Sequence, residues 1–182
     1  MSIRLGNPDD ATLGIAERVF DALAVVGDLT DSSRDGSGEP GMARLYAYAS
    51  DAGAALDPDL EDVIARDVRL RANFELLLVR TALHRFPTVA AASAGPISER
   101  EAEGCRIRFQ QSQAEPNQTY IIIELAAGQS ETPKALFLCG PHRAARKYAL
   151  PEAHEGVIQM LVESDAEVLE GLRDIDAEVF LR

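Results

Sequence analysis

The chain has 182 residues, 46% of them hydrophobic, and its 30 Asp and Glu against 18 Lys and Arg give a formal net charge of -12. This length and composition suit one globular domain or two small ones and exclude a chain that is disordered throughout. The negative charge serves solubility and repels nucleic acid and anionic membranes, so the partner we expect is a protein with a basic surface. No apolar run is long enough for a signal peptide or a membrane span, which predicts a cytoplasmic protein without membrane contact.

The first predicted element is a helix within residues 1–27. It starts with the cap, proline and acid pattern of Asn7 to Asp10, and Gly27 ends it. Residues 28–41 are rich in Gly, Ser and Asp and nearly free of apolar side chains, which predicts a flexible linker. A calcium loop is disfavoured there because the ligand order and terminal Glu of such loops are absent.

Residues 42–95 are predicted to form a helical hairpin module. Met42 to Ala55 is alanine-rich and favours a first helix. The second helix is predicted from Asp57 to Phe86, because Asp57 can cap it, Pro58 suits the first position, and Pro87 disfavours continuation. Apolar residues recur there every three to four positions and predict a buried face made of Leu60, Val63, Ile64, Leu70, Phe74, Leu77, Leu78 and Ala82.

Residues 96–182 are predicted to form a mainly antiparallel, sandwich-like β domain. Alternating or β-branched runs separated by turn residues indicate its strands. The runs are Arg106 to Phe109, Thr119 to Leu125, Ala135 to Cys139, Lys147 to Leu150, Val157 to Val162 and Glu178 to Leu181. Ser164 to Glu167 resembles a capping box and predicts a short helix or turn before the last strand. The predicted fold class is therefore α+β, with the helical part N-terminal.

Few side chains are available for catalysis or metal binding. Cys139 and His142 could form a nucleophile and base pair, or a zinc site with His154 and Glu152. The spacing matches no standard zinc pattern, and a cysteine that closes an apolar strand is usually buried. No phosphate-binding loop, nucleophile elbow or zinc-protease motif occurs. The sequence predicts no metal, cofactor or catalytic residue, and it favours a protein that is not an enzyme.

Two charged clusters are candidate binding surfaces. The basic cluster consists of His142, Arg143, Arg146 and Lys147. It is predicted to bind an anion. The alternative is a solvated turn whose basic side chains pair with nearby acids. The acidic C-terminal stretch is predicted to dock a partner, together with Arg69 and Arg71 of the helix predicted from Asp57 to Phe86. The alternative is a face that is merely solvated. The residues of the acidic stretch are Glu163, Asp165, Glu167, Glu170, Asp174 and Asp176.

Three segments of the helical part resemble the sigma-binding region of bacterial anti-sigma factors: Leu45 to Tyr48, Leu56 to Leu60, and Asp67 to Arg71. The later half resembles, more loosely, the all-β C-terminal domains of these proteins. The resemblance implies a helical module that sequesters a sigma factor, whose DNA-binding surface is basic. The chain lacks the zinc motif and the membrane helix that many members carry.

These observations predict a non-enzymatic regulatory protein that captures a protein partner through its helical face or its acidic C-terminal surface. Two alternatives stay open. One is a small-ligand-binding or enzymatic β domain that uses Cys139 and His142. The other is a subunit or assembly chaperone of a larger complex.

Overall fold

The computed structural model describes residues 41–89, 97–129, 131–141 and 143–182. The helix predicted within residues 1–27 and nearly all of the predicted linker lie outside the described residues. The chain divides into two units, residues 1–43 and 44–182, and the contacts discussed below lie within the second unit.

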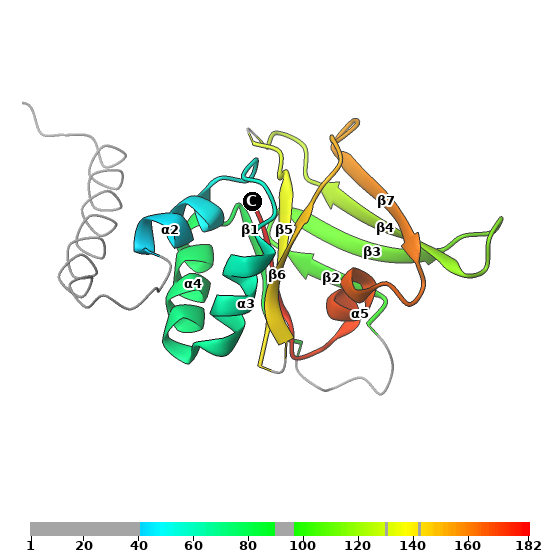
Figure 1. The fold of residues 1–182 in the computed structure, drawn as a ribbon. Helices are drawn as coiled ribbons and strands as arrows, with labels where there is room; N and C mark the ends of the chain where they lie inside the picture. The colour runs from blue at the N-terminus through cyan, green and yellow to red at the C-terminus, as the bar shows by residue number, and fades with distance from the viewer. Residues whose placement is uncertain (1–40, 90–96, 130, 142) are drawn as a thin grey trace, which may run out of the picture. The chain divides into compact units, whose positions relative to one another are not determined.

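Three described helices precede the strands, and a fourth lies between the last two strands (Figure 1). The helices are α2 (Met42–Ser50), α3 (Pro58–Arg66), α4 (Val68–Thr81) and α5 (Glu167–Arg173). The strands are β1 (His84–Phe86), β2 (Glu99–Ala102), β3 (Cys105–Gln111), β4 (Gln118–Leu125), β5 (Ala135–Gly140), β6 (Arg143–Ala149), β7 (Val157–Glu163) and β8 (Glu178–Leu181).

The strands form two four-stranded antiparallel sheets, in the orders β1-β8-β5-β6 and β2-β3-β4-β7. In the first sheet β5 lies between β8 and β6, so that Leu136 is opposite Leu181 on one side and Tyr148 on the other. This arrangement confirms the predicted α+β class, with helices in the N-terminal part and antiparallel strands in the C-terminal part. Each of the six predicted strand runs overlaps an observed strand.

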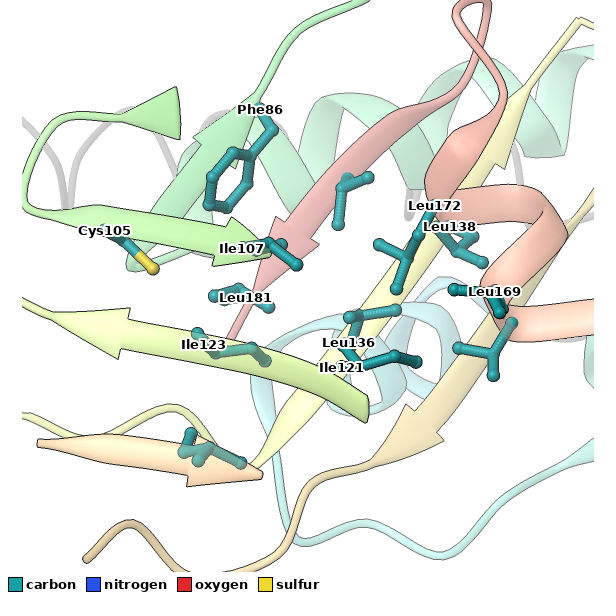
Figure 2. Packing of buried hydrophobic residues seen from close by; sticks show 13 residues of the cluster. Phe86, Cys105, Ile107, Ile121, Ile123, Leu136, Leu138, Leu169, Leu172 and Leu181 are labelled. Atoms are coloured by element: carbon teal, nitrogen blue, oxygen red, sulfur yellow. The ribbon is translucent and has the colours of Figure 1, made fainter. Parts of the chain in front are cut away.

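The main hydrophobic core joins side chains from both sheets and α5 (Figure 2). Ile107 and Ile121 come from the second sheet, Leu136 and Leu181 from the first, and Leu169 from α5. Helix α5 forms because its apolar residues Val168, Leu169 and Leu172 share one buried face, while Glu167 and Glu170 are exposed.

The helical part covers the other face of the first sheet. The Phe137 ring of β5 lies 6.1 Å from the Tyr48 ring of α2 and 5.9 Å from the Phe74 ring of α4, measured between centroids. Residues Ala135–Cys139 of β5 are all buried, because even-numbered side chains face the core and odd-numbered ones face the helices. A continuous apolar run in this strand is therefore the signature of a strand covered on both faces.

The single helix predicted from Asp57 to Phe86 is wrong, because the chain forms two helices and a strand. Asp67 separates the helices: its amide donates to the Val63 carbonyl, and its side chain accepts from the Arg69 and Leu70 amides at the start of α4. Helix α4 ends at Thr81, and the chain pairs with β8 as β1. The predicted cap and proline at the start of α3 are confirmed. The buried face is confirmed at Leu60, Ile64, Leu70, Phe74, Leu77 and Leu78.

The capping box before α5 is also wrong in detail. Residue Ala166 occupies the cap position and makes no side-chain cap hydrogen bond. The Ser164 hydroxyl instead lies 3.0 Å from the Thr119 hydroxyl of β4. The short helix predicted here is confirmed, since α5 lies between β7 and β8.

Candidate functional site

A buried carboxylate fixes the helical part to the sheet. Residue Glu61, on α3, is 6% exposed. It accepts hydrogen bonds from the Tyr48 hydroxyl at 2.7 Å, the Lys147 amide at 2.8 Å and the Arg146 guanidinium at 3.0 Å. Three donors satisfy the buried charge, which otherwise has a large desolvation cost. Helices α2 and α3 are thereby joined to β6.

Lys147 makes a second connection at the same place. Its ammonium donates to the carbonyls of Asp51 and Ala54 at 2.9 and 3.0 Å, and it lies 4.8 Å from the centre of the Tyr48 ring. Burial lowers the pKa of this ammonium. The loop after α2 is thus held against β6 by Lys147, a member of the predicted anion-binding cluster.

The predicted anion-binding cluster is therefore partly engaged in the fold. Arg146 pairs with Glu61 and lies 3.8 Å from the Glu167 carboxylate, and Lys147 is buried. Arg143 occupies the first position of β6, and His142 lies outside the described residues. Anion binding by this cluster stays a prediction.

The outer face of α4 carries a stripe of exposed apolar side chains, Val68, Ala72, Leu76 and Val79, which we call the outer stripe. Val68 is 77% exposed, Leu76 44% and Val79 41%. At 100° per residue these four positions fall within one third of the helix circumference. The opposite face buries Leu70, Phe74, Leu77 and Leu78. Helix α4 is thus apolar on both faces, which is typical of a helix that is packed on both sides.

Two arginines border the outer stripe. Arg69 and Arg80 follow Leu76 around the helix, and both are exposed. Neither forms a salt bridge within the part of the chain that the structure describes. Arg71, the other arginine predicted to bind a partner, is half-buried and donates to the Ala65 carbonyl at 2.6 Å. Of the two predicted arginines, only Arg69 lies on the outer face.

Exposed large hydrophobic side chains are concentrated in the helical part. Within the described residues they are Tyr46, Leu56, Val68, Leu76 and Val79 in the helical part, and Val157 and Leu161 on β7. Sequence reasoning missed the outer stripe because it searched for the buried face alone. The sequence does contain a sign of the outer stripe, because the apolar residues Val68, Leu76 and Val79 fall outside the predicted buried face of the helix.

The six predicted acidic residues extend from the end of β7 through α5 to the turn before β8. Glu163 accepts a hydrogen bond from Asn117 at 3.0 Å, and the Asp174 carboxylate accepts the Asp176 amide at 3.0 Å. Glu167 and Glu170 lie in the first turn of α5, where negative charge complements the helix dipole. Asp165 is exposed in the preceding turn. Part of this charge therefore has a local structural role.

Residue Cys139 is 3% exposed, and burial raises the pKa of its thiol well above the ordinary value. It lines a hollow of about 240 Å³ whose charged side chains are Glu75, Asp176 and Glu178. A nucleophilic cysteine needs the opposite environment, one that stabilises the thiolate. Burial likewise raises the pKa of Cys105 to about 12. Among the described residues, no three His, Cys, Asp or Glu side chains are grouped so as to hold a metal ion.

The comparisons with known proteins add no assignment. No protein-family model, curated protein or solved structure matches this chain. Across the described residues, none of the helices combines the length and hydropathy needed to cross a bilayer. The outer face of α4 is therefore the candidate site that the geometry itself supports best.

Proposed function

We propose that this chain is a non-enzymatic regulatory protein that acts in the cytoplasm by binding another protein through the outer face of α4. The observation that carries the proposal is the outer stripe. Its side chains are exposed to water, although they belong to a helix whose opposite face fills the core. Burial of this stripe by a partner supplies the hydrophobic driving force for association.

The surroundings of α4 favour a preformed binding surface. Phe74 packs against Phe137 of the sheet, and the hydrogen bonds of Glu61 hold α3, next to α4, on β6. A helix fixed in this way loses little conformational entropy when a partner binds. The acidic C-terminal surface is a second proposed contact, and it suits a partner with a basic surface.

The test is quantitative affinity purification of the tagged full chain from its host. The double variant Leu76→Glu/Val79→Glu is compared with wild type and with Leu161→Glu, a matched control that changes an equally exposed hydrophobic residue on β7. We expect wild type and the control to recover the same protein in near-equal amounts, and the double variant to lose it. Equal recovery by all three proteins, or recovery of no protein by wild type, contradicts the proposal.

The anti-sigma resemblance names one specific form of this function, the capture of a sigma factor. It stays a proposal, and the identity of the recovered protein decides it. Recovery of several proteins in fixed stoichiometry supports instead a subunit or assembly chaperone of a larger complex.

A further inference from the structure

We infer that the segment that packs on the outer stripe is an amphipathic helix of another protein, with Asp or Glu beside its apolar face. This inference rests on the proposed function and specifies the chemistry of the partner. It follows from the shape of the stripe, from the two arginines that border it, and from the charge of the chain.

The stripe suits a helix better than an extended strand. Residues 68, 72, 76 and 79 form one continuous ridge about 16 Å long. Ridges of this kind pack into the grooves of a second helix. An added strand gains its affinity from main-chain hydrogen bonds to a free sheet edge. Helix α4 already satisfies its backbone groups internally and offers no such edge, so the partner must bring its own backbone hydrogen bonds.

The arginines set the charge of the partner at this surface. Arg69 and Arg80 lie on the same side of the stripe, 11 residues apart, and form no salt bridge within the described residues. Carboxylates at matching positions of the partner helix pair with both guanidinium groups. Lysine or arginine there places like charges together, which is unfavourable. The net charge of -12 acts at longer range, where salt screens it, and attracts the basic surface that we expect elsewhere on the partner without changing the contact at the stripe.

A second copy of this chain fits the surface less well. In an antiparallel pair of α4 helices related by a twofold axis, the side of the stripe that carries Arg69 and Arg80 faces the same side of its copy. Each copy also carries a charge of -12. Both effects oppose self-association, so we commit to a different protein as the occupant.

The experiment is a display selection with a defined probe. The probe is a library of 18-residue peptides with fixed leucines on one helical face, in which the flanking positions are randomised among Asp, Ser and Lys. The library is selected against the purified full chain, and against Arg69→Glu/Arg80→Glu, Leu76→Glu and the control Arg106→Glu. All of these positions are exposed, so folding is expected to persist, and circular dichroism and urea unfolding check that it does.

With wild type and the control, we expect the selected peptides to carry Asp about fivefold or more as often as Lys at the flanking positions. This ratio is the size expected of exposed ion pairs. The double arginine variant should reverse this preference, and Leu76→Glu should lose enrichment. Enrichment that depends on Leu76 without a preference for Asp overturns the charge inference while leaving the proposed function intact. No enrichment above Leu76→Glu overturns the helical partner, and the affinity purification then judges the proposed function separately. Sedimentation that shows a wild-type dimer, lost in Leu76→Glu, overturns the inference in favour of a second copy.

Discussion

At the scale of single residues, α4 places a buried and an exposed hydrophobic side chain two positions apart. Phe74 is 1% exposed and contacts two aromatic rings, whereas Leu76 is 44% exposed. Their sequence surroundings are similar, so the difference in environment comes from the direction in which each side chain leaves the helix. Substitution of Phe74 therefore tests the contribution of α4 to stability, and substitution of Leu76 tests its contribution to binding.

We expect Phe74→Ala to lower the free energy of unfolding by about 3 to 5 kcal/mol, since it leaves a cavity in the core. Leu76→Ala should lower it by about 1 kcal/mol or less, because Leu76 is 44% exposed and buries only part of its side chain. Urea unfolding followed by circular dichroism measures both. Similar losses for the two variants would show that the assignment of the two faces of α4 is wrong.

Tyr48 links stability to alkaline pH. Burial, and then its hydrogen bond to Glu61, raise the pKa of the phenol well above its ordinary value of 10.0. The folded protein thus keeps the Tyr48 proton, which the unfolded chain releases above pH 10. The contribution of the protonated phenol to stability is therefore complete below pH 10 and is lost as the pH rises above it. Between pH 9 and 11, the free energy of unfolding of wild type should fall by about 1.4 kcal/mol more than that of Tyr48→Phe. Urea titrations at the two pH values measure this difference, and equal losses count against a protonated buried Tyr48.

At the scale of elements, Asp67 decides that two helices form instead of one. Its carboxylate accepts the Arg69 amide at 2.7 Å and the Leu70 amide at 3.1 Å, and so begins α4 at the point where α3 ends. The change of direction lets α3 contact β6 while Phe74 of α4 reaches Phe137. The orientation of the outer stripe depends on this break.

We expect Asp67→Ala to lower the free energy of unfolding by about 0.5 to 2 kcal/mol through loss of the cap. The control is Asp62→Ala, which removes long ion pairs with Arg66 at 3.5 Å and Arg146 at 3.9 Å and should cost no more than about 0.5 kcal/mol. Chemical denaturation compares the two variants. If both lose the same amount, the Asp67 carboxylate has no capping role beyond its charge.

At the scale of the whole second unit, Arg100 of β2 connects the two sheets. Its buried guanidinium donates to the Leu172 carbonyl at 2.7 Å, the Ala177 carbonyl at 3.1 Å and the carbonyl of Asp174. A side chain of the second sheet thereby holds the end of α5 and the residue that precedes β8 of the first sheet.

Replacement of Arg100 by Met should destabilise the protein by about 1 to 3 kcal/mol for each buried carbonyl left without a donor. The matched control is Arg106→Met on β3, where an exposed pair with Glu101 at 2.8 Å is lost at a cost within about 1 kcal/mol. Thermal and urea unfolding measure both variants. A loss for Arg100→Met no larger than that of the control would contradict a connecting role.

The sequence by itself determined the class of the fold, the cap at Asp57, most of the buried face of α3 and α4, and the position of six of the eight described strands, β3 to β8. These features depend on local side-chain chemistry and on periodicity, which the sequence displays directly. Only the tertiary structure decided that the chain pairs with β8 immediately after α4, that Glu61 is buried, and that Arg146 and Lys147 contact the helical part. Each of these depends on groups far apart in the chain, such as Glu61 and Lys147, whose contact no local pattern encodes. The outer stripe combines both sources. Its spacing is in the sequence, and its exposure follows from which face of α4 the sheet covers.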